Sequence, residues 1–312
     1  MKKIFNTLTL LLWVITSQAQ TEFHTQDSLA RSIKKNKFPT PDALAKVLCK
    51  DLKNDRDKAR VLFTWVAENI RYDFDAMGKE GPEASSKKEY EDKMVKQVYT
   101  KGKGVCMHYA LLYKRMADAV GLECAFITGN SKGSVRGGWA SHAWNAVNIE
   151  GEWKLLDATW GAGYFDVDDG KFVQVFQPGF FFTPPRIFAL DHFPDDEKWQ
   201  LLETPMDKTT FKKQCAFSYG DPLLGIMDAE PFGLPLAKGT DGKMELRLKA
   251  AQPPSVIQLR MGGREIAFEQ SVKDGWITLR FSPAQGRELQ VWSGKKTRKV
   301  ISTTLMGIFP VK

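Results

Sequence analysis

The chain has 312 residues, which is enough for two domains of ordinary size or one large domain. Hydrophobic residues make up 43% and charged residues 26%, a composition typical of a soluble globular protein. The net charge is +8, but no basic stripe with interleaved aromatic residues occurs, so nucleic-acid binding is not indicated and only weak attraction to anionic cell-envelope components is expected.

The first nineteen residues have the layout of a signal peptide. Lys2 and Lys3 give a positive start, an apolar run extends from Ile4 to Ile15, and Ser17-Gln-Ala19 supplies small residues for a cleavage site. We expect cleavage after Ala19 and therefore a secreted or periplasmic protein. The alternative is an N-terminal membrane anchor, although the run is short for a spanning helix, which needs ~20 residues.

Helical periodicity dominates the next part of the chain. Residues 42–49 carry apolar side chains at helical spacing, with Cys49 on the apolar face as a core residue. Residues 55–70 repeat apolar side chains every three or four positions, which predicts a strong amphipathic helix. A polar loop over residues 75–88 and a short helix over residues 90–98 are expected to follow.

Cys106 begins another predicted helix, which runs to about Val120. The unpaired backbone N–H groups of a first helical turn stabilise an anion, so the pKa of a thiol placed there should fall. Gly102 and Gly104 precede the cysteine and would allow the backbone to approach a substrate carbonyl closely. Cys106 is therefore the candidate nucleophile.

A predicted hairpin presents a histidine and a carboxylate on one face. Strands are expected over residues 123–128, 142–149 and 152–159. With Glu150-Gly151 as a two-residue turn, His142 lies opposite Thr159, and Asp157 becomes its diagonal neighbour at ~7 Å between backbones. Asp157 would then fix the imidazole tautomer while the other ring nitrogen faces a thiol, the arrangement of an activated nucleophile.

The remainder of the chain changes character twice. Residues 172–199 are aromatic and rich in proline, which favours extended segments and turns wrapped around the first domain. Beyond about Lys212, alternating strands separated by turn residues are typical of a small all-β sandwich, and we expect them over residues 243–249, 276–281 and 289–292. The predicted domains are residues 20–211 and residues 212–312.

Three motifs, taken together, resemble the transglutaminase-like superfamily. They are Lys103-Gly-Val-Cys106, Ser141-His-Ala-Trp-Asn145 and Leu156-Asp-Ala-Thr-Trp-Gly161. Three further segments resemble the kyphoscoliosis-peptidase branch: Phe180-Phe-Phe-Thr-Pro-Pro185, His192-Phe-Pro194 and Trp199-Gln-Leu-Leu202. The resemblance covers roughly residues 42–211. Each motif is short, and their order and spacing make the combination specific.

The resemblance implies an α+β, papain-like fold and acyl transfer through a thioester on Cys106, with His142 as base and Asp157 as orienter. Peptide or isopeptide bonds are the implied substrates. Water as acyl acceptor gives a peptidase or amidase, and an amine gives a protein cross-linker. The oxyanion would be stabilised by the Cys106 backbone N–H and one upstream side chain, for which Gln97 and Tyr99 are candidates.

Two other hypotheses stay open at this point. A non-catalytic module would use the papain-like domain to hold a peptide or protein, and a glycanase would use the same fold for a different thiol reaction. The intact triad argues against the first hypothesis, and no sequence feature favours the second. His108, which follows Cys106 closely, is expected to project away from the thiol and to be a structural or surface residue.

No metal or other cofactor is predicted. The four cysteines match no zinc motif, and the acidic cluster of Asp166, Asp168 and Asp169 is incomplete as a calcium loop. If Cys106 stays a free thiol, at most one disulfide can form, and it would join two of Cys49, Cys124 and Cys215.

Overall fold

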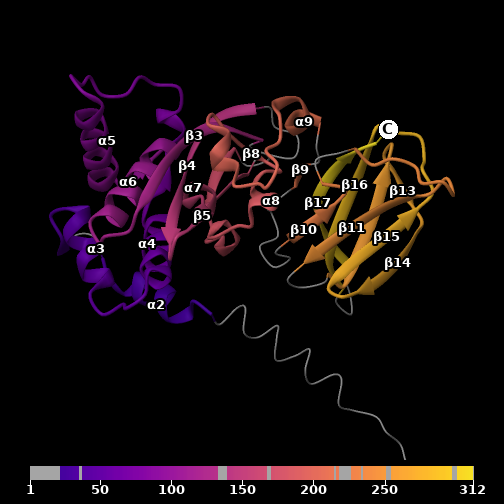
Figure 1. Cartoon of the computed structure of the whole chain (residues 1–312), viewed down its shortest axis with the longest axis horizontal. Helices are drawn as coiled ribbons and strands as arrows, with labels where there is room; N and C mark the ends of the chain where they lie inside the picture. The colour runs from indigo at the N-terminus through magenta and orange to yellow at the C-terminus, as the bar shows by residue number, and fades with distance from the viewer. Residues whose placement is uncertain are drawn as a thin grey trace, which may run out of the picture.

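The computed structural model describes residues 22–34, 37–132, 139–166, 170–213, 216–217, 226–232, 235–250, 254–296 and 301–311. The predicted leader lies outside these ranges. Helices dominate the first part of the chain, a mixed region follows, and the last part consists of strands (Figure 1). Within the ranges given above, no helix combines the length and apolar character needed to cross a membrane.

Five helices form the first part of the described chain. They are α2 (His24–Ser32), α3 (Pro41–Cys49), α4 (Asp55–Asn69), α5 (Lys87–Lys101) and α6 (Cys106–Asp118). The side chains of Thr40, Asn54 and Ser86 accept hydrogen bonds from backbone N–H groups at the starts of α3, α4 and α5. The Ser86 cap explains why α5 begins before the predicted residue 90, and the left-handed Gly102 (φ 69°) ends the helix.

The central helix α4 is buried along most of its length. Leu62, Phe63 and Trp65 are fully buried, and the helix packs against α2, α3, α6 and α7. Cys49, at the end of α3, joins the same core as predicted.

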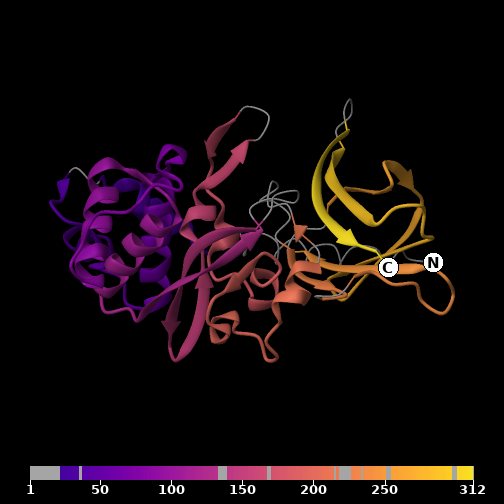
Figure 2. The same ribbon diagram turned by 90° about the horizontal axis from the view of Figure 1, so that it is seen from above.

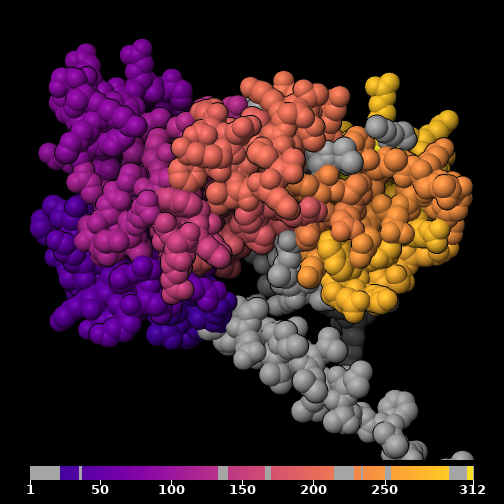
Figure 3. Space-filling model, in the orientation of Figure 1, coloured from indigo at the N-terminus to yellow at the C-terminus, as the bar shows by residue number. Residues whose placement is uncertain are grey.

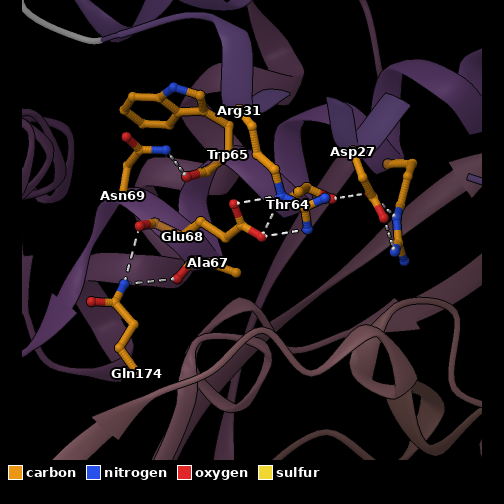
Figure 4. Close-up of polar contacts among 9 residues, drawn as sticks. Asp27, Arg31, Thr64, Trp65, Ala67, Glu68, Asn69 and Gln174 are labelled. Carbon is orange, nitrogen blue, oxygen red and sulfur yellow. Dashed lines mark hydrogen bonds and ion pairs between the residues drawn. The ribbon is translucent and has the colours of Figure 1, made fainter. Parts of the chain in front are cut away.

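The N-terminal helix α2 is fastened to α4 by two ion pairs (Figure 4). Asp27 accepts hydrogen bonds from Arg60 at 2.8 Å and from the Thr64 hydroxyl at 2.6 Å. Arg31 donates to Glu68 at 2.6 Å. The described part of the segment that precedes residue 42 therefore packs on α4.

A four-stranded antiparallel sheet packs beside these helices, in the order β5-β4-β3-β8. Its strands are β3 (Cys124–Lys132), β4 (Trp139–Ile149), β5 (Glu152–Leu156) and β8 (His192–Pro194). Glu150 (φ 55°) and Gly151 (φ 90°) form the predicted turn between β4 and β5. The register is also as predicted, but pairing ends at Asn145↔Leu156. The predicted strand to residue 159 is wrong, because Asp157 leaves the sheet and caps the short helix α7 (Ala158–Gly161).

The aromatic segment after residue 170 does more than wrap the domain, because its strand β8 extends the central sheet. Ser131 pairs with His192, and Gly129 pairs with Pro194. A Cβ atom on Gly129 would lie 2.2 Å from the Phe193 carbonyl oxygen, so only glycine allows this close strand contact. The segment also contains η3 (Pro178–Phe180), α8 (Pro185–Phe188), η4 (Glu197–Gln200) and α9 (Lys208–Lys213).

A two-stranded hairpin of β6 (Gly163–Asp166) and β7 (Lys171–Gln174) projects from the body of the domain (Figure 2). Gln174 ties its base to α4, since the Gln174 amide donates to the carbonyls of Glu68 at 3.1 Å and Ile70 at 3.2 Å. These carbonyls lie at the end of α4, where no intrahelical partner is available.

Two further sheets form a β-sandwich in the C-terminal part. Their strand orders are β10-β11-β15-β14 and β13-β12-β16-β17-β9. The three predicted strands are present as β11 (Met244–Ala250), β15 (Trp276–Phe281) and β16 (Glu288–Lys296). The others are β9 (Ala216–Phe217), β10 (Ile226–Glu230), β12 (Val256–Met261), β13 (Arg264–Ile266), β14 (Phe268–Lys273) and β17 (Ile301–Pro310).

The sandwich core is made by the alternating faces of the facing sheets. Leu246 and Leu279 contribute from one sheet, and Leu259 and Leu289 from the other. Ile187 of α8 belongs to the same hydrophobic cluster. The segment around α8 thus lies between the helical part and the sandwich, as the space-filling view also shows (Figure 3).

Candidate active site

The candidate nucleophile is held at the start of α6 by a short parallel strand pair. In this pair β1 (Arg71–Tyr72) lies beside β2 (Lys103–Gly104), with Tyr72 opposite Gly104. Val105 is the N-cap residue, and its N–H donates to Nδ1 of His108 at 3.2 Å. Cys106 is therefore the first helical residue, as predicted, and its side chain is half-buried.

The two glycines before Cys106 have structural roles at the end of α5 and at the start of α6. Gly102 adopts the left-handed conformation that ends α5. A Cβ atom on Gly104 would lie 2.6 Å from Cβ of His108, so glycine is needed for the histidine to reach back to Val105. At Gly104, His108 thus makes a close approach to the backbone. His108 therefore has a structural role, because its side chain caps the start of α6. The approach of a substrate carbonyl to these glycines stays a prediction.

We expect His108→Ala to lower the free energy of unfolding by about 1 kcal/mol, the usual effect of losing a helix cap. His108→Gln is the matched control, because a glutamine at this position can still accept the N-cap N–H. Burial lowers the pKa of His108, so its contribution to stability should be complete above the ordinary histidine pKa of ~6.5 and lost as the pH falls. Equal stability of the wild type and the alanine variant in urea would contradict this role.

The predicted contact between His142 and Asp157 is present. Nε2 of His142 lies 2.7 Å from Oδ2 of Asp157, and both side chains are buried. The other carboxylate oxygen accepts the backbone N–H groups of Thr159 at 2.8 Å and Trp160 at 3.1 Å. Asp157 therefore orients the imidazole and caps α7 with the same carboxylate.

Because Nε2 of His142 faces the carboxylate, Nδ1 is the ring nitrogen left for the thiol. Burial disfavours the imidazolium, but Asp157 and a hydrogen bond with Cys106 outweigh it and raise the pKa of His142 to about 10. Burial also raises the pKa of the Cys106 thiol, but the hydrogen bond and charge of His142 outweigh that effect, so the pKa is lowered overall. Burial opposes ionisation of Asp157, yet His142 and then His192 hold the pKa of this carboxyl well below its usual range.

The other described cysteines have the opposite character. Cys49 and Cys124 are buried free thiols. Burial raises the pKa of Cys49 to about 12 and also raises the pKa of Cys124. Both are unreactive core residues by this criterion, which separates them from Cys106. Cys215 lies outside the described residues, so a bridge to it stays untested.

Aromatic rings enclose the histidine. The centroid of the Trp144 ring lies 5.9 Å from that of His142, and the centroid of the Trp160 ring lies 5.5 Å from it. Trp144 is buried, and Trp160 is half-buried beside Phe180 at 5.4 Å. The rings limit water around the imidazole and strengthen its interaction with Asp157.

A residue without a predicted chemical role, His192, also reaches the site. Its Nε2 lies 3.2 Å from Oδ2 of Asp157, and its Nδ1 lies 2.6 Å from Oδ1 of Asp191. The sequence offered only the His192-Phe-Pro194 motif as a signal. The contact depends on β8 pairing with β3, which the composition of this segment did not predict.

Among the described residues, one group of His, Cys, Asp and Glu side chains is close enough to hold a metal ion, namely His142, Asp157 and His192. Oδ2 of Asp157 already accepts hydrogen bonds from both imidazoles, and Nδ1 of His142 is the nitrogen available to the thiol. Hydrogen bonds therefore account for the group. Of the acidic cluster considered for calcium, Asp168 and Asp169 lie outside the described residues.

The two oxyanion candidates occupy the same helix, α5. The hydroxyl of Tyr99 donates to the Phe38 carbonyl at 3.1 Å, and the ring packs against Trp65 with centroids 6.3 Å apart. This hydroxyl is thus engaged by the lead-in segment before α3. Gln97 is half-buried on α5. The assignment of the upstream donor to Gln97 or Tyr99 stays a prediction.

The chain resembles known proteins in this region and beyond it. Residues 42–158 match the transglutaminase-like superfamily. Kyphoscoliosis peptidase of Mus musculus is 28% identical over 265 residues, which cover 83% of this chain and 39% of that protein. The Homo sapiens kyphoscoliosis peptidase is 28% identical over 259 residues, with coverage of 81% and 38%. The chain thus spans less than half of the length of these relatives.

One solved structure, described as a TGase, is 19% identical to the chain. The match covers 51% of this chain and 35% of that chain, with a TM-score of 0.29.

Proposed function

Because residues 42–158 form a transglutaminase-like domain of the branch represented by kyphoscoliosis peptidase, we propose that the chain is a thiol enzyme acting on peptide or isopeptide bonds. Its triad is Cys106, His142 and Asp157. The observation that carries the proposal is the hydrogen-bonded series from a thiol of lowered pKa through His142 to a buried carboxylate 2.7 Å from the ring.

The reaction follows from the positions of these groups. The Cys106 thiolate attacks the substrate carbonyl, and the carbonyl electron pair moves to oxygen to form a tetrahedral oxyanion. When this intermediate collapses, His142 gives its proton to the leaving amine, and a thioester remains on Cys106. Neutral His142 then takes a proton from the acyl acceptor, which attacks the thioester and releases the thiolate.

Hydrolysis is the proposed outcome, with water as the acceptor. The name of the two peptidase relatives supports it by analogy. Transamidation to an amine is the alternative, and the same intermediate serves both. The two outcomes are separated by incubating the protein with a soluble primary amine and a peptide that it cleaves. The masses of the products are then measured by mass spectrometry. A free carboxylate as the sole product indicates a peptidase, and an amide adduct indicates a cross-linker.

We expect iodoacetamide to alkylate Cys106 rapidly well below the reference thiol pKa of ~8.5. The physical reason is the ion pair, because imidazolium at His142 stabilises the thiolate. In His142→Ala, burial and the charge of Asp157 still raise the pKa of the thiol, so the midpoint of the pH profile should move to the reference value or above it. Mass spectrometry of the Cys106 peptide gives the rate, with buried Cys49 as an internal control.

The opposite result would favour the binding-module hypothesis. Slow labelling that titrates near the reference pKa and does not respond to His142→Ala would leave a peptide- or protein-binding domain without thiol chemistry.

We also propose that the protein acts outside the cytoplasm, on peptides or proteins that include cell-envelope components. The layout of residues 1–19 supports this proposal, as does the net charge of +8, of which +6 remains once Lys2 and Lys3 are removed. Determining the N-terminal residue of the protein recovered from the producing cells tests it. A start at Gln20 is expected, and retention of Met1 would contradict it.

A further inference from the structure

His192 places each of its ring nitrogens against a buried carboxylate. Nε2 faces Oδ2 of Asp157 at 3.2 Å, and Nδ1 faces Oδ1 of Asp191 at 2.6 Å. The side chains of His192 and Asp157 are fully buried, and that of Asp191 is 2% exposed. The second oxygen of Asp191 has no hydrogen-bond partner among the described residues.

The protonation state of His192 follows from this arrangement. A neutral imidazole has a single N–H, so it would leave one ring lone pair pointing at a carboxylate oxygen. An imidazolium donates from both nitrogens and satisfies both contacts. Burial opposes the charge, but Asp191 and Asp157 outweigh it, and the pKa of His192 is raised overall.

The surroundings of His192 come from three elements, α7, α8 and β4. Phe188 of α8 stacks on the ring at 3.8 Å, and the rings of Trp160 and Trp144 lie at 4.4 Å and 5.0 Å. The titratable groups that face it are Asp157, Asp191 and His142, whose ring centroid lies 5.4 Å away. The aromatic walls keep these groups dry, so each charge acts strongly on the others.

One atom therefore serves two imidazoles. Oδ2 of Asp157 accepts from His142 at 2.7 Å and from His192 at 3.2 Å. A carboxylate that gives part of its charge to a second cation stabilises the first cation less. His192 is also a positive charge beside His142, which acts in the same direction.

We propose that His192 is a positioning residue that, as a doubly donating imidazolium, shares the Asp157 carboxylate with His142 and limits how strongly that carboxylate retains the proton of His142. The inference rests on the proposed function, because retention of this proton matters when His142 must give it to a leaving amine. Proton transfer is most effective when the donor does not hold its proton far more tightly than the working pH requires.

The test is nitrogen NMR on full-length protein labelled with ¹⁵N-histidine. The chain has four histidines, so few signals need assignment. Cys106→Ala serves as the background, because it removes the coupled titration of the thiol. We expect His192 to show two protonated ring nitrogens at pH 7. Adding His192→Phe, which retains the stacking on Phe188, should raise the titration midpoint of His142 by about one pH unit, a tenfold tighter hold on the proton.

Asp191→Asn provides a second variant if His192→Phe does not fold. It weakens the imidazolium at His192 and should move the His142 midpoint upward by a smaller amount. A singly protonated His192 ring at pH 7 would overturn the proposal. So would an unchanged or lowered His142 midpoint in either folded variant, because a residue that only fills space would not raise it. These readouts need no substrate, so their outcome is independent of whether Cys106 performs acyl transfer.

Discussion

On the proposed function, replacing Asp157 with asparagine is expected to lower turnover by about 10,000-fold. The carboxylate receives four donors: two imidazole N–H groups at Oδ2 and two backbone N–H groups at Oδ1. An asparagine has one carbonyl oxygen, and its NH₂ group would face two of these donors. The variant must therefore misorient His142 or lose the cap of α7, and it removes the charge that stabilises the imidazolium.

The measurement is turnover of a fluorogenic peptide selected on the wild-type protein. Thr159→Val is the matched control, because Thr159 contributes its backbone N–H to Asp157 and its hydroxyl has no partner in the described structure. This control should stay near wild-type activity. A loss of less than tenfold in Asp157→Asn would mean that the carboxylate is mainly a helix cap.

The contact between His142 and Asp157 was predictable from the sequence because the two residues lie close together along the chain, on either side of one turn. Cys106 opens a helix, and His142 and Asp157 flank a two-residue turn whose register the residues at 150 and 151 determine. The predicted strand to residue 159 was wrong because Asp157 accepts the backbone N–H groups of α7 instead of continuing the strand. A strand-end aspartate followed by small residues can cap a helix, and the sequence pattern did not distinguish this from two more paired positions.

The contribution of His192 required tertiary information. It lies 35 residues from Asp157, on a three-residue strand with aromatic and proline neighbours. Such a strand is too short to show a period, and it forms because Gly129 lets the Phe193 carbonyl come close. The missed sandwich strands include the edge strands β13 and β14, which are largely exposed and show little alternation of buried and exposed residues.

Asp27→Ala is expected to lower the free energy of unfolding by about 3–5 kcal/mol, because it leaves a buried cation without its partner. The Arg60 side chain is 5% exposed, and Asp27 pairs with it through both carboxylate oxygens at 2.8 Å. The guanidinium also lies under the rings of Phe23 and Phe181, so it cannot reach solvent without disrupting their packing. Urea denaturation at neutral pH gives the change.

A neighbouring ion pair supplies the control. Arg31 and Glu68 join the same two helices at 2.6 Å, but their side chains are 47% and 24% exposed. Arg31→Ala should therefore change stability by at most about 1 kcal/mol. If both variants lose the same small amount, burial of Arg60 is not what gives the Asp27 contact its importance.

The double variant Asp27→Ala with Arg60→Met separates the two terms that the single substitution combines. Replacing both partners with apolar groups removes the attraction, but it also removes the buried charge that makes the single variant unstable. We expect the double variant to recover most of the loss caused by Asp27→Ala. Recovery would show that α2 is held on α4 mainly by apolar packing, around Phe23 and the ring of Phe181, which lie 5.4 Å apart. If the double variant instead loses more stability than Asp27→Ala alone, the ion pair itself holds α2 on α4.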